Sequence, residues 1–284
     1  MKDWINNYLH ARKHIIDNES KLILDEEYRV TNLIINRLIS RYKEIKKDFD
    51  DAYATKKYWE KYAPIQRGYK PRNESYPWGE VGEKVIEGHL YSSLNDIFGT
   101  PRFPGIPYGH DIRFSTESSF VHIDVKSTGP TDNTNEIVSS PNQVTGNGMI
   151  CHSGMIYNDE VDMIGPQKTR KFRPELAPFY LIERKIIPVL TFYIKAVYSV
   201  TCLGNQPLKY IELICVPNGI PLFVSPNFNQ SFPGILTPGK DQQNVLRKRT
   251  RIKLNPLSMI NDWRCQKIFI NKNNDVEVLK RCHF

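Results

Sequence analysis

The chain has 284 residues and an apolar content of 40%, which is the composition of a folded globular protein. It contains no run of 18 or more apolar residues, and its first residues lack the apolar segment of a signal peptide, so we expect no membrane span. The formal net charge of +8 favours a polyanionic partner such as nucleic acid. The five cysteines show neither a CxxC pair nor metal-ligand spacing, so reduced thiols in a cytoplasmic protein are the simplest interpretation.

The N-terminal region is predicted to be helical. Apolar residues recur with a helical period from about Asp25 to Asp51, with Lys and Arg between them. Residues 1–17 predict a shorter helix. We expect both helices to serve as scaffold or as dimer contacts rather than in catalysis.

A further helical pattern, from Val81 to Leu94, carries a row of glutamates. Glu80, Glu83 and Glu87 fall on one face at spacings of three and four. Such a row is usually solvated surface. One of these carboxylates would complete a metal site if this helix packs beside the hairpin that follows.

The segment from Tyr108 to Ser127 has the pattern of a β-hairpin, because two runs rich in β-branched and aromatic residues flank a short polar turn. Asp111 is predicted on the first strand. Asp124 and Lys126 lie two residues apart on the second strand, so they share a face. Asp111 lies about as far before the turn as Asp124 lies after it, and strand pairing can therefore bring the two carboxylates together.

Two carboxylates and a lysine on one face can hold Mg²⁺ and a water beside a phosphate. Mg²⁺ prefers oxygen ligands, lowers the pKa of its water and neutralises charge on a phosphoryl group. The order Asp, then Asp-x-Lys, is the sparse signature of PD-(D/E)xK nucleases. The triplet alone also occurs by chance, and the alternative interpretation is an exposed strand face with an ion pair.

The rest of the chain predicts a polar loop and a set of strands. Residues 140–148 are rich in small, amide and hydroxyl side chains, which suits contact with bases and phosphates, although an ordinary surface loop has the same composition. A turn is predicted at residues 217–219. The apolar runs predict strands of a mixed sheet at residues 186–200, 208–216, 221–224, 247–254 and 267–270. The expected fold class is therefore α/β (α+β), with a mixed β-sheet flanked by helices.

The most basic segment runs from Lys240 to Lys253. Arg247, Arg249 and Arg251 alternate, so on a strand they share one face. Arginines placed in this way can reach guanine O6 and N7 in a major groove. The alternative is a strand with one solvated, charged face.

Several motifs together resemble the BglI family of restriction endonucleases. They run in the same order from about residue 50 to residue 255, and the N-terminal helices and the last thirty or so residues match only weakly. The blocks Ser-Pro-Asn-Gln-Val and Pro-Gly-Lys-Asp are far more specific than Asp-x-Lys. The motifs include Glu-Val-Gly-Glu-Lys at 80–84, Asp-Val-Lys-Ser at 124–127, Ser-Pro-Asn-Gln-Val at 140–144 and Pro-Gly-Lys-Asp at 238–241.

The resemblance implies a type II site-specific deoxyribonuclease with the PD-(D/E)xK fold, acting on double-stranded DNA as a homodimer with Mg²⁺. A cognate DNA methyltransferase would be present in the same cell. Asp111, Asp124 and Lys126 would be the catalytic set with Glu83 beside them, and the three carboxylates would be the metal ligands. The residues expected to contact DNA, including two from the polar loop, are Asp132, Asn142, Gln143, Lys240, Asp241, Gln242, Arg249 and Arg251.

Enzymes of this type read an interrupted palindrome with G·C-rich half-sites and leave 3′ overhangs, so a GCC-N5-GGC-like site is expected. The chain departs from the family pattern in two places. The segment between Asp241 and Arg249 is shorter, and Gln242 stands where a second acid would accept a hydrogen bond from cytosine N4. A GC-N7-GC-like site, with fewer specified pairs, is therefore an alternative. His110 replaces the proline before the first catalytic Asp, which should matter little.

The chain is expected to form a single domain over residues 1–284. Its parts would be N-terminal helices (1–55), a catalytic core (77–130) and DNA-recognition and sheet elements (131–255). Two rival functions remain: a repair or junction nuclease of the same fold that cuts by structure, and a DNA-binding module that has lost catalysis. The intact Asp111, Asp124 and Lys126 speak against the second rival.

Overall fold

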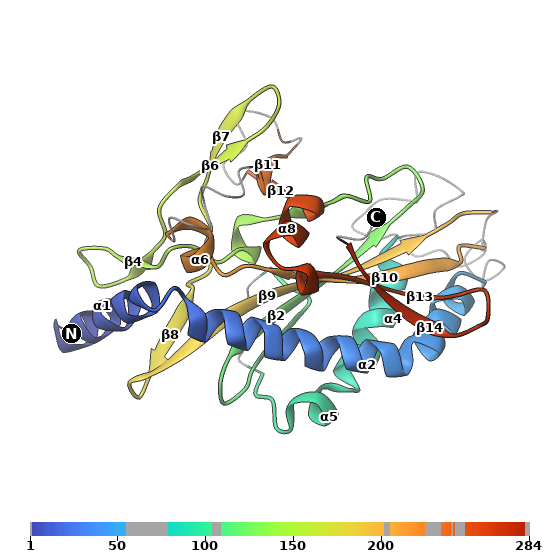
Figure 1. The fold of residues 1–284 in the computed structure, drawn as a ribbon, viewed down its shortest axis with the longest axis horizontal. Helices are drawn as coiled ribbons and strands as arrows, with labels where there is room; N and C mark the ends of the chain where they lie inside the picture. Colours follow the sequence, from blue (N-terminus) through green and yellow to red (C-terminus); the bar gives the residue numbers. More distant parts are fainter. Residues whose placement is uncertain are drawn as a thin grey trace, which may run out of the picture.

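The computed structural model describes residues 2–54, 79–103, 109–201, 205–224, 234–239, 241 and 248–281. Helices pack on one face of a seven-stranded mixed sheet, and a smaller three-stranded sheet lies toward its other face (Figure 1). The predicted α/β (α+β) fold with a mixed sheet is confirmed. Within the described ranges, no helix combines the length and the apolar character that crossing a membrane requires.

Both predicted N-terminal helices are present. The long helix α2 presents Ile34, Leu38, Tyr42 and Ile45 to the sheet, at spacings of three and four residues, and all four are buried. Its burial confirms the predicted scaffold role. The helices and 3₁₀ turns are α1 (Lys2–Asp17), α2 (Lys21–Ala54), α4 (Gly79–Tyr91), α5 (Leu94–Phe98), η1 (Pro141–Gln143), α6 (Gly219–Phe223), α8 (Leu254–Ile260) and η2 (Asp262–Arg264).

The large sheet has the order β1-β2-β9-β10-β13-β14, with β8 paired to β9. Strands β2 and β9 are parallel, and the other neighbours are antiparallel. Three of the predicted apolar runs form the strands β9, β10 and β13. The bounds are β1 (Ile112–Ser115), β2 (Phe120–Thr128), β8 (Phe179–Ile182), β9 (Lys185–Tyr198), β10 (Leu208–Val216), β13 (Cys265–Ile270) and β14 (Val276–Lys280).

The smaller sheet joins strands that lie far apart in the sequence, in the order β11-β12-β3. The short hairpin β6–β7 lies beside it and projects from the body at the upper left of Figure 1, while the short hairpin β4–β5 packs near α1. The bounds are β3 (Glu136–Ser139), β4 (Met149–Ile150), β5 (Ile156–Tyr157), β6 (Val161–Ile164), β7 (Thr169–Phe172), β11 (Leu236–Pro238) and β12 (Thr250–Lys253).

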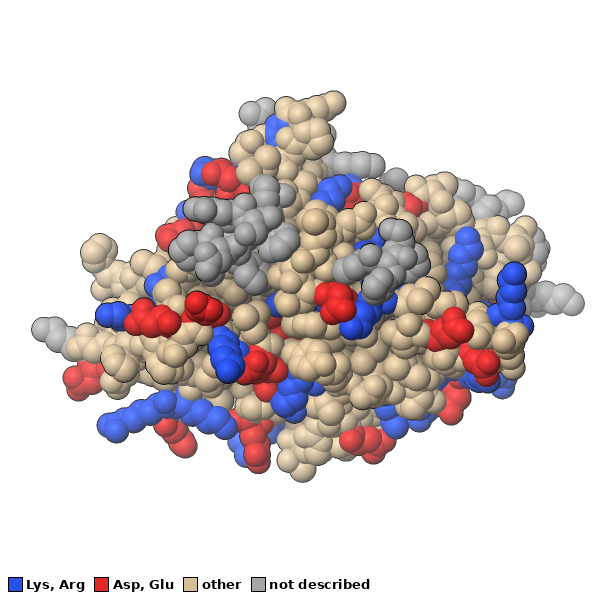
Figure 2. Space-filling view, viewed as in Figure 1, with Lys and Arg blue, Asp and Glu red and all other residues tan. Residues whose placement is uncertain are grey.

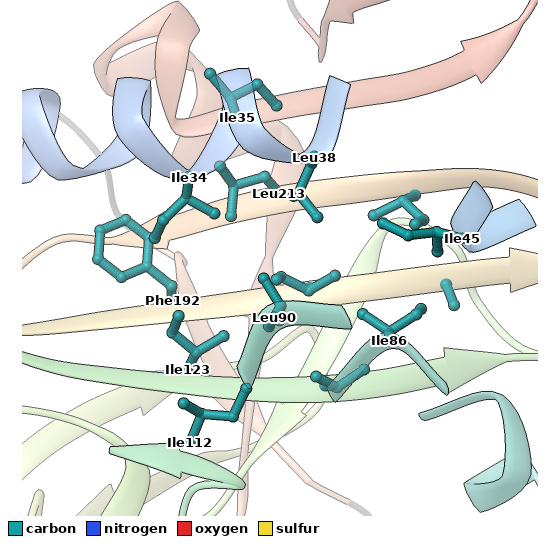
Figure 3. Close-up of a cluster of buried hydrophobic side chains, with 14 of the residues drawn as sticks. Ile34, Ile35, Leu38, Ile45, Ile86, Leu90, Ile112, Ile123, Phe192 and Leu213 are labelled. Atoms are coloured by element: carbon teal, nitrogen blue, oxygen red, sulfur yellow. The ribbon is translucent and has the colours of Figure 1, made fainter. Parts of the chain in front are cut away.

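Alternation along β2 and β9 divides the core into two parts. Ile123 and Phe192 join the cluster that packs under α2 and α4 (Figure 3). Tyr193, the next residue on β9, belongs to the cluster on the opposite face, with residues of β3 and β12. Asp124 pairs with Tyr193 in the β2–β9 register, so it is turned toward this second face.

Three sequence predictions are corrected. Residues 221–224 were expected to form a strand, but they lie within or directly after helix α6, because a short apolar run fits either element. The expected turn at 217–219 is the start of that helix, where the Asn218 side chain accepts a hydrogen bond from the Ile220 amide. The strand expected at 247–254 is shorter, and helix α8 begins at Leu254.

Candidate active site

The β1–β2 hairpin brings the two predicted carboxylates together. Ile112 pairs with Ile123, so one further step in the register sets Asp111 opposite Asp124. Asp111 lies one residue before β1 rather than on it as predicted. Its Oδ2 accepts a hydrogen bond from the Val125 amide at 2.8 Å, which fixes the carboxylate against the strand that carries Asp124.

Asp124 and Lys126 share a face of β2, as predicted, and form an ion pair with 2.5 Å between Nζ and Oδ2. Asp124 is only 1% exposed. Burial therefore raises the pKa of Asp124 to about 7, with Asp111 and Glu83 adding to the rise and Lys126 opposing it. Burial alone would lower the pKa of Lys126, but the Asp124 carboxylate outweighs it and the pKa is raised, so Lys126 stays charged.

Helix α4 packs beside the hairpin and supplies the third carboxylate. Glu83 Oε1 accepts hydrogen bonds from the Ser127 amide at 2.7 Å and from the Ser127 hydroxyl at 3.0 Å. Glu87, one turn later, is buried and bonded to Lys84 at 2.7 Å. Its pKa is raised by burial, and also by the nearby charges of Asp111 and Glu83. Acidic groups are thus crowded at this end of β2.

The site's chemistry fits a divalent cation. The described residues include no group of three or more His, Cys, Asp or Glu side chains arranged as a metal cage. Mg²⁺ beside a phosphate needs fewer protein ligands than such a cage provides, since one or two carboxylates, substrate oxygens and waters are its usual ligands. Asp111 and Asp124 provide two carboxylates, and a bound cation would relieve the repulsion that raises the pKa of Asp124.

Gln143 was predicted to contact DNA, but the structure uses its amide inside the protein. Its Nε2 donates to Asp124 Oδ1 at 2.7 Å and to the Gly109 carbonyl, and its Oε1 accepts from the Ser140 amide at 3.0 Å. The residue is 6% exposed, so it has neither a free group nor access for a base contact. Asn142 lies half-buried against Gly109, and its contact with DNA stays a prediction.

Two buried histidines lie behind the carboxylates. The rings of His110 and His122 are 4.8 Å apart, centroid to centroid. Burial lowers the pKa of both, and that of His122 falls to about 3. Both rings are therefore neutral near pH 7. That His110 in place of proline matters little stays a prediction.

Of the basic residues predicted to alternate along one strand, Arg251 and Lys253 lie on β12, Arg249 lies one residue before it, and Arg247 lies outside the described residues. Thr250 and Ile252 are buried, while Arg251 and Lys253 share the other, partly exposed face. Both cations are paired with Glu136 on the neighbouring strand β3. No local pattern identifies Glu136 as their partner, because more than a hundred residues separate it from Arg251 and Lys253 in the sequence.

Arg249 is held in place by Asp241. Its Nε and Nη2 donate to Asp241 Oδ1 at 2.9 and 2.5 Å, and its backbone amide donates to Oδ2 at 2.7 Å. The Arg249 hydrogen bond lowers the pKa of Asp241. The Arg249 side chain remains 53% exposed, so the pair presents a fixed guanidinium to solvent. The predicted DNA contacts Lys240 and Gln242 lie outside the described residues.

A hollow of about 510 Å³ connects the catalytic and basic parts of the molecule. Lys126 and Arg251 both line it, as do Asp132, Glu136 and Lys195. Asp132 is exposed in the turn after β2, where its Oδ2 accepts from the Gly129 amide at 2.9 Å. The structure therefore brings the end of the catalytic strand close to the strand that carries Arg251.

Two buried cations that sequence analysis missed support the turn between β2 and β3. Lys195 Nζ donates to the carbonyls of Thr134 at 2.6 Å and Glu136 at 3.1 Å. Arg281 donates to the Thr134 carbonyl at 3.1 Å and forms a buried ion pair with Glu212. Burial lowers the pKa of Lys195 to about 8. Nothing local in the sequence marks these long-range contacts.

A mixed sheet whose hairpin presents two carboxylates and a lysine beside a helix glutamate defines a nuclease of the restriction-endonuclease fold. The family described as restriction endonuclease BglI matches residues 3–268. The type II restriction enzyme BglI of Bacillus subtilis is 33% identical over 287 residues, which cover 89% of this chain and 95% of that protein. The chain therefore belongs to the BglI restriction endonuclease family, and it is a restriction endonuclease, an enzyme that cleaves DNA.

Solved structures agree with this assignment. The crystal structure of BglI bound to its DNA recognition sequence matches with a TM-score of 0.84 at 29% identity, covering 95% of this chain and 98% of that one. Tetrameric SfiI bound to cognate DNA matches with a TM-score of 0.55 at 11% identity, covering 93% and 94%. The second likeness concerns the fold alone. The predicted family and enzyme class are confirmed.

Proposed function

We propose that this enzyme cuts both strands of DNA in a Mg²⁺-dependent reaction, at a G·C-rich interrupted palindrome, and leaves 3′ overhangs. The observation that carries the proposal is the buried Asp124 carboxylate, paired with Lys126 while Asp111 and Glu83 are bonded to the same strand. This set of carboxylates and a lysine suits metal-dependent phosphodiester hydrolysis.

Each residue of the site has a role that its position supports. Asp111, Asp124 and Glu83 would hold Mg²⁺, which when bound neutralises phosphate charge and lowers the pKa of water. Lys126 stays charged, and its side chain is 37% exposed at the rim of the site. It can therefore reach a phosphate in the hollow, orient the attacking water and stabilise the charge that develops.

Base recognition would come from the basic segment and the neighbouring turns. The Arg249 guanidinium is exposed and held by Asp241, which suits a contact with guanine O6 and N7. Arg251 and Asp132 line the hollow beside the catalytic strand. The BglI crystal structure contains DNA, which supports a DNA-binding surface in this family. Asn142 and the residues Lys240 and Gln242, which lie outside the described ranges, complete the proposed set.

The recognition site would follow GCC-N5-GGC, or GC-N7-GC if Gln242 gives up the contact that an acid would make. An interrupted palindrome is read most simply by a two-fold dimer. We therefore propose a homodimer of single-domain chains, working in the cytoplasm beside a cognate methyltransferase. Light scattering of the enzyme on a palindromic duplex should give two chains of 33.1 kDa per duplex. One chain per duplex would contradict the dimer.

Digestion of a fully sequenced plasmid tests the proposal. Purified enzyme is incubated with the plasmid with and without Mg²⁺, and the fragment ends are sequenced. Discrete fragments that share an interrupted palindrome and carry 3′ extensions support the proposal and give the site directly. A smear would favour a nuclease that cuts by structure, and equal cutting in excess EDTA would exclude the Mg²⁺ requirement.

A further inference from the structure

We propose that Gln143 is a positioning residue that fixes the two metal-binding carboxylates, Asp111 and Asp124, relative to one another. The inference rests on the proposed function, because it concerns the metal that these carboxylates would hold. The buried side-chain amide of Gln143 donates a hydrogen bond directly to Asp124. It also donates to the backbone carbonyl of Gly109, two residues before Asp111.

Both hydrogens of the Gln143 amide nitrogen are committed. One goes to Asp124 Oδ1 at 2.7 Å, and the other goes to the carbonyl of Gly109, two residues before Asp111. The amide cannot be reversed, because Oε1 accepts the Ser140 amide hydrogen in the capping box of η1. The orientation of the Gln143 amide is therefore set by its hydrogen bond from the Ser140 backbone amide.

These contacts close a ring of hydrogen bonds around the site. From Gln143 the ring passes through Gly109 to Asp111, whose carboxylate accepts from the Val125 amide. Val125 adjoins Asp124, which accepts from Gln143. With Oδ1 engaged by the amide, a cation would bind at Asp124 Oδ2, the oxygen that faces Lys126 Nζ at 2.5 Å.

Glutamine suits this position better than other residues of similar size. A methionine would leave the Gly109 carbonyl and Asp124 Oδ1 without their donor, and a glutamate would set a second carboxylate against a group that is already crowded by charge. Partners that orient a metal ligand in this way typically change metal affinity by about 10- to 100-fold when they are lost.

The test compares Gln143→Met with Asn158→Leu. Asn158 is a matched control, because its buried amide also donates twice, to the carbonyls of Pro174 and Leu176, and accepts once, from the Gly148 amide. It contacts none of the site's carboxylates. For each full-length protein, one measures the Mg²⁺ concentration that gives half-maximal cleavage, and separately the rise in Tm on adding Mg²⁺ without DNA.

The inference predicts that Gln143→Met raises the half-maximal Mg²⁺ concentration at least about tenfold and shrinks the Mg²⁺-induced rise in Tm. Asn158→Leu should lower Tm without Mg²⁺ and leave both Mg²⁺ responses as in the wild type. If Gln143→Met fails to fold, Gln143→Asn, which keeps an amide but shortens its reach, should shift both responses in the same direction.

Two results would overturn the inference and are distinguishable. If the wild type responds to Mg²⁺ in both assays and the Gln143 variant responds identically, Gln143 is structural only and the proposed function stands. If the wild type shows neither Mg²⁺-dependent cleavage nor Mg²⁺-dependent stabilisation, the proposed function fails and the inference fails with it.

Discussion

At the scale of single residues, the site places charge where the fold would be more stable without it. Asp124 is buried, and Asp111 and Glu83 lie close enough to raise its pKa further. Lys126 compensates in part. An arrangement of this kind holds a carboxylate ready for a cation at a cost in stability, which is common at functional sites.

This cost predicts a pH dependence of stability. The pKa of Asp124 rises from 3.8 to about 7 on folding, so the folded state favours the protonated acid, and the free energy of unfolding falls as the pH rises between these values. In metal-free buffer, the wild type should lose roughly 2 kcal/mol relative to Asp124→Asn between about pH 5 and pH 8. Urea denaturation at both pH values measures the difference. Parallel pH profiles for the two proteins would contradict the raised pKa.

At the scale of elements, helix α2 is tied to the far end of the chain by a buried ion pair. Glu27 and Arg264 are both 0% exposed, with 2.7 Å between Oε2 and Nη2. Glu27 Oε1 also accepts from the Asn218 amide, so one carboxylate joins α2, η2 and the start of α6. Burial raises the pKa of Glu27, and Arg264 opposes the rise.

Removing one member of this pair should be costly. Glu27→Ala leaves the Arg264 charge buried without its partner, so we expect a loss of roughly 3–5 kcal/mol in unfolding free energy. Glu44→Ala, on the same helix, is the matched control, because the Glu44 side chain is 59% exposed and its pair with Arg41 should contribute about 1 kcal/mol or less. Guanidinium denaturation of both variants and the wild type measures the two losses in unfolding free energy. Equal losses would show that burial of the pair does not set its importance.

The segment that carries Arg249 should govern the choice of site. Arg249→Ala removes an exposed guanidinium, and the loss of a bidentate base contact is worth about 1–3 kcal/mol of discrimination. We expect cleavage at related, non-cognate sites to rise relative to cognate cleavage, while nonspecific affinity changes less. Sequencing of fragment ends from genomic DNA measures this. An unchanged distribution of cut sites would show that Arg249 does not read bases.

Local patterns predicted the elements well and the long-range contacts poorly. Strand periodicity was enough to pair Asp124 with Lys126. Helical spacing gave only a row of three glutamates, and the family resemblance was needed to single out Glu83 among them. Burial was not available from the sequence, so Gln143 was assigned to DNA although its amide faces Asp124. The Glu136 partner of Arg251 was missed because only the β3–β12 pairing brings the two together.

At the scale of the whole molecule, the positively charged residues are not equally suited to binding DNA. The face shown in Figure 2 carries acidic and basic residues intermingled. On helix α2, Arg29 and Arg41 are each paired with a glutamate, Glu26 and Glu44. A surface of mixed sign attracts a polyanion weakly. We therefore expect DNA to lie along the hollow that Lys126 and Arg251 line, rather than along α2.

The most direct test of the central claim measures cleavage and binding by the same variant. Asp124→Ala should lower the rate of Mg²⁺-dependent cleavage at least about 100-fold, because one of the carboxylates proposed to hold the metal is lost. Specific binding of the same duplex, measured by gel retardation, should persist. Asp262→Ala is the control, since its pair with Lys280 is an ordinary exposed one. Undiminished cleavage by Asp124→Ala, or loss of cleavage and binding together in a folded protein, would contradict the account.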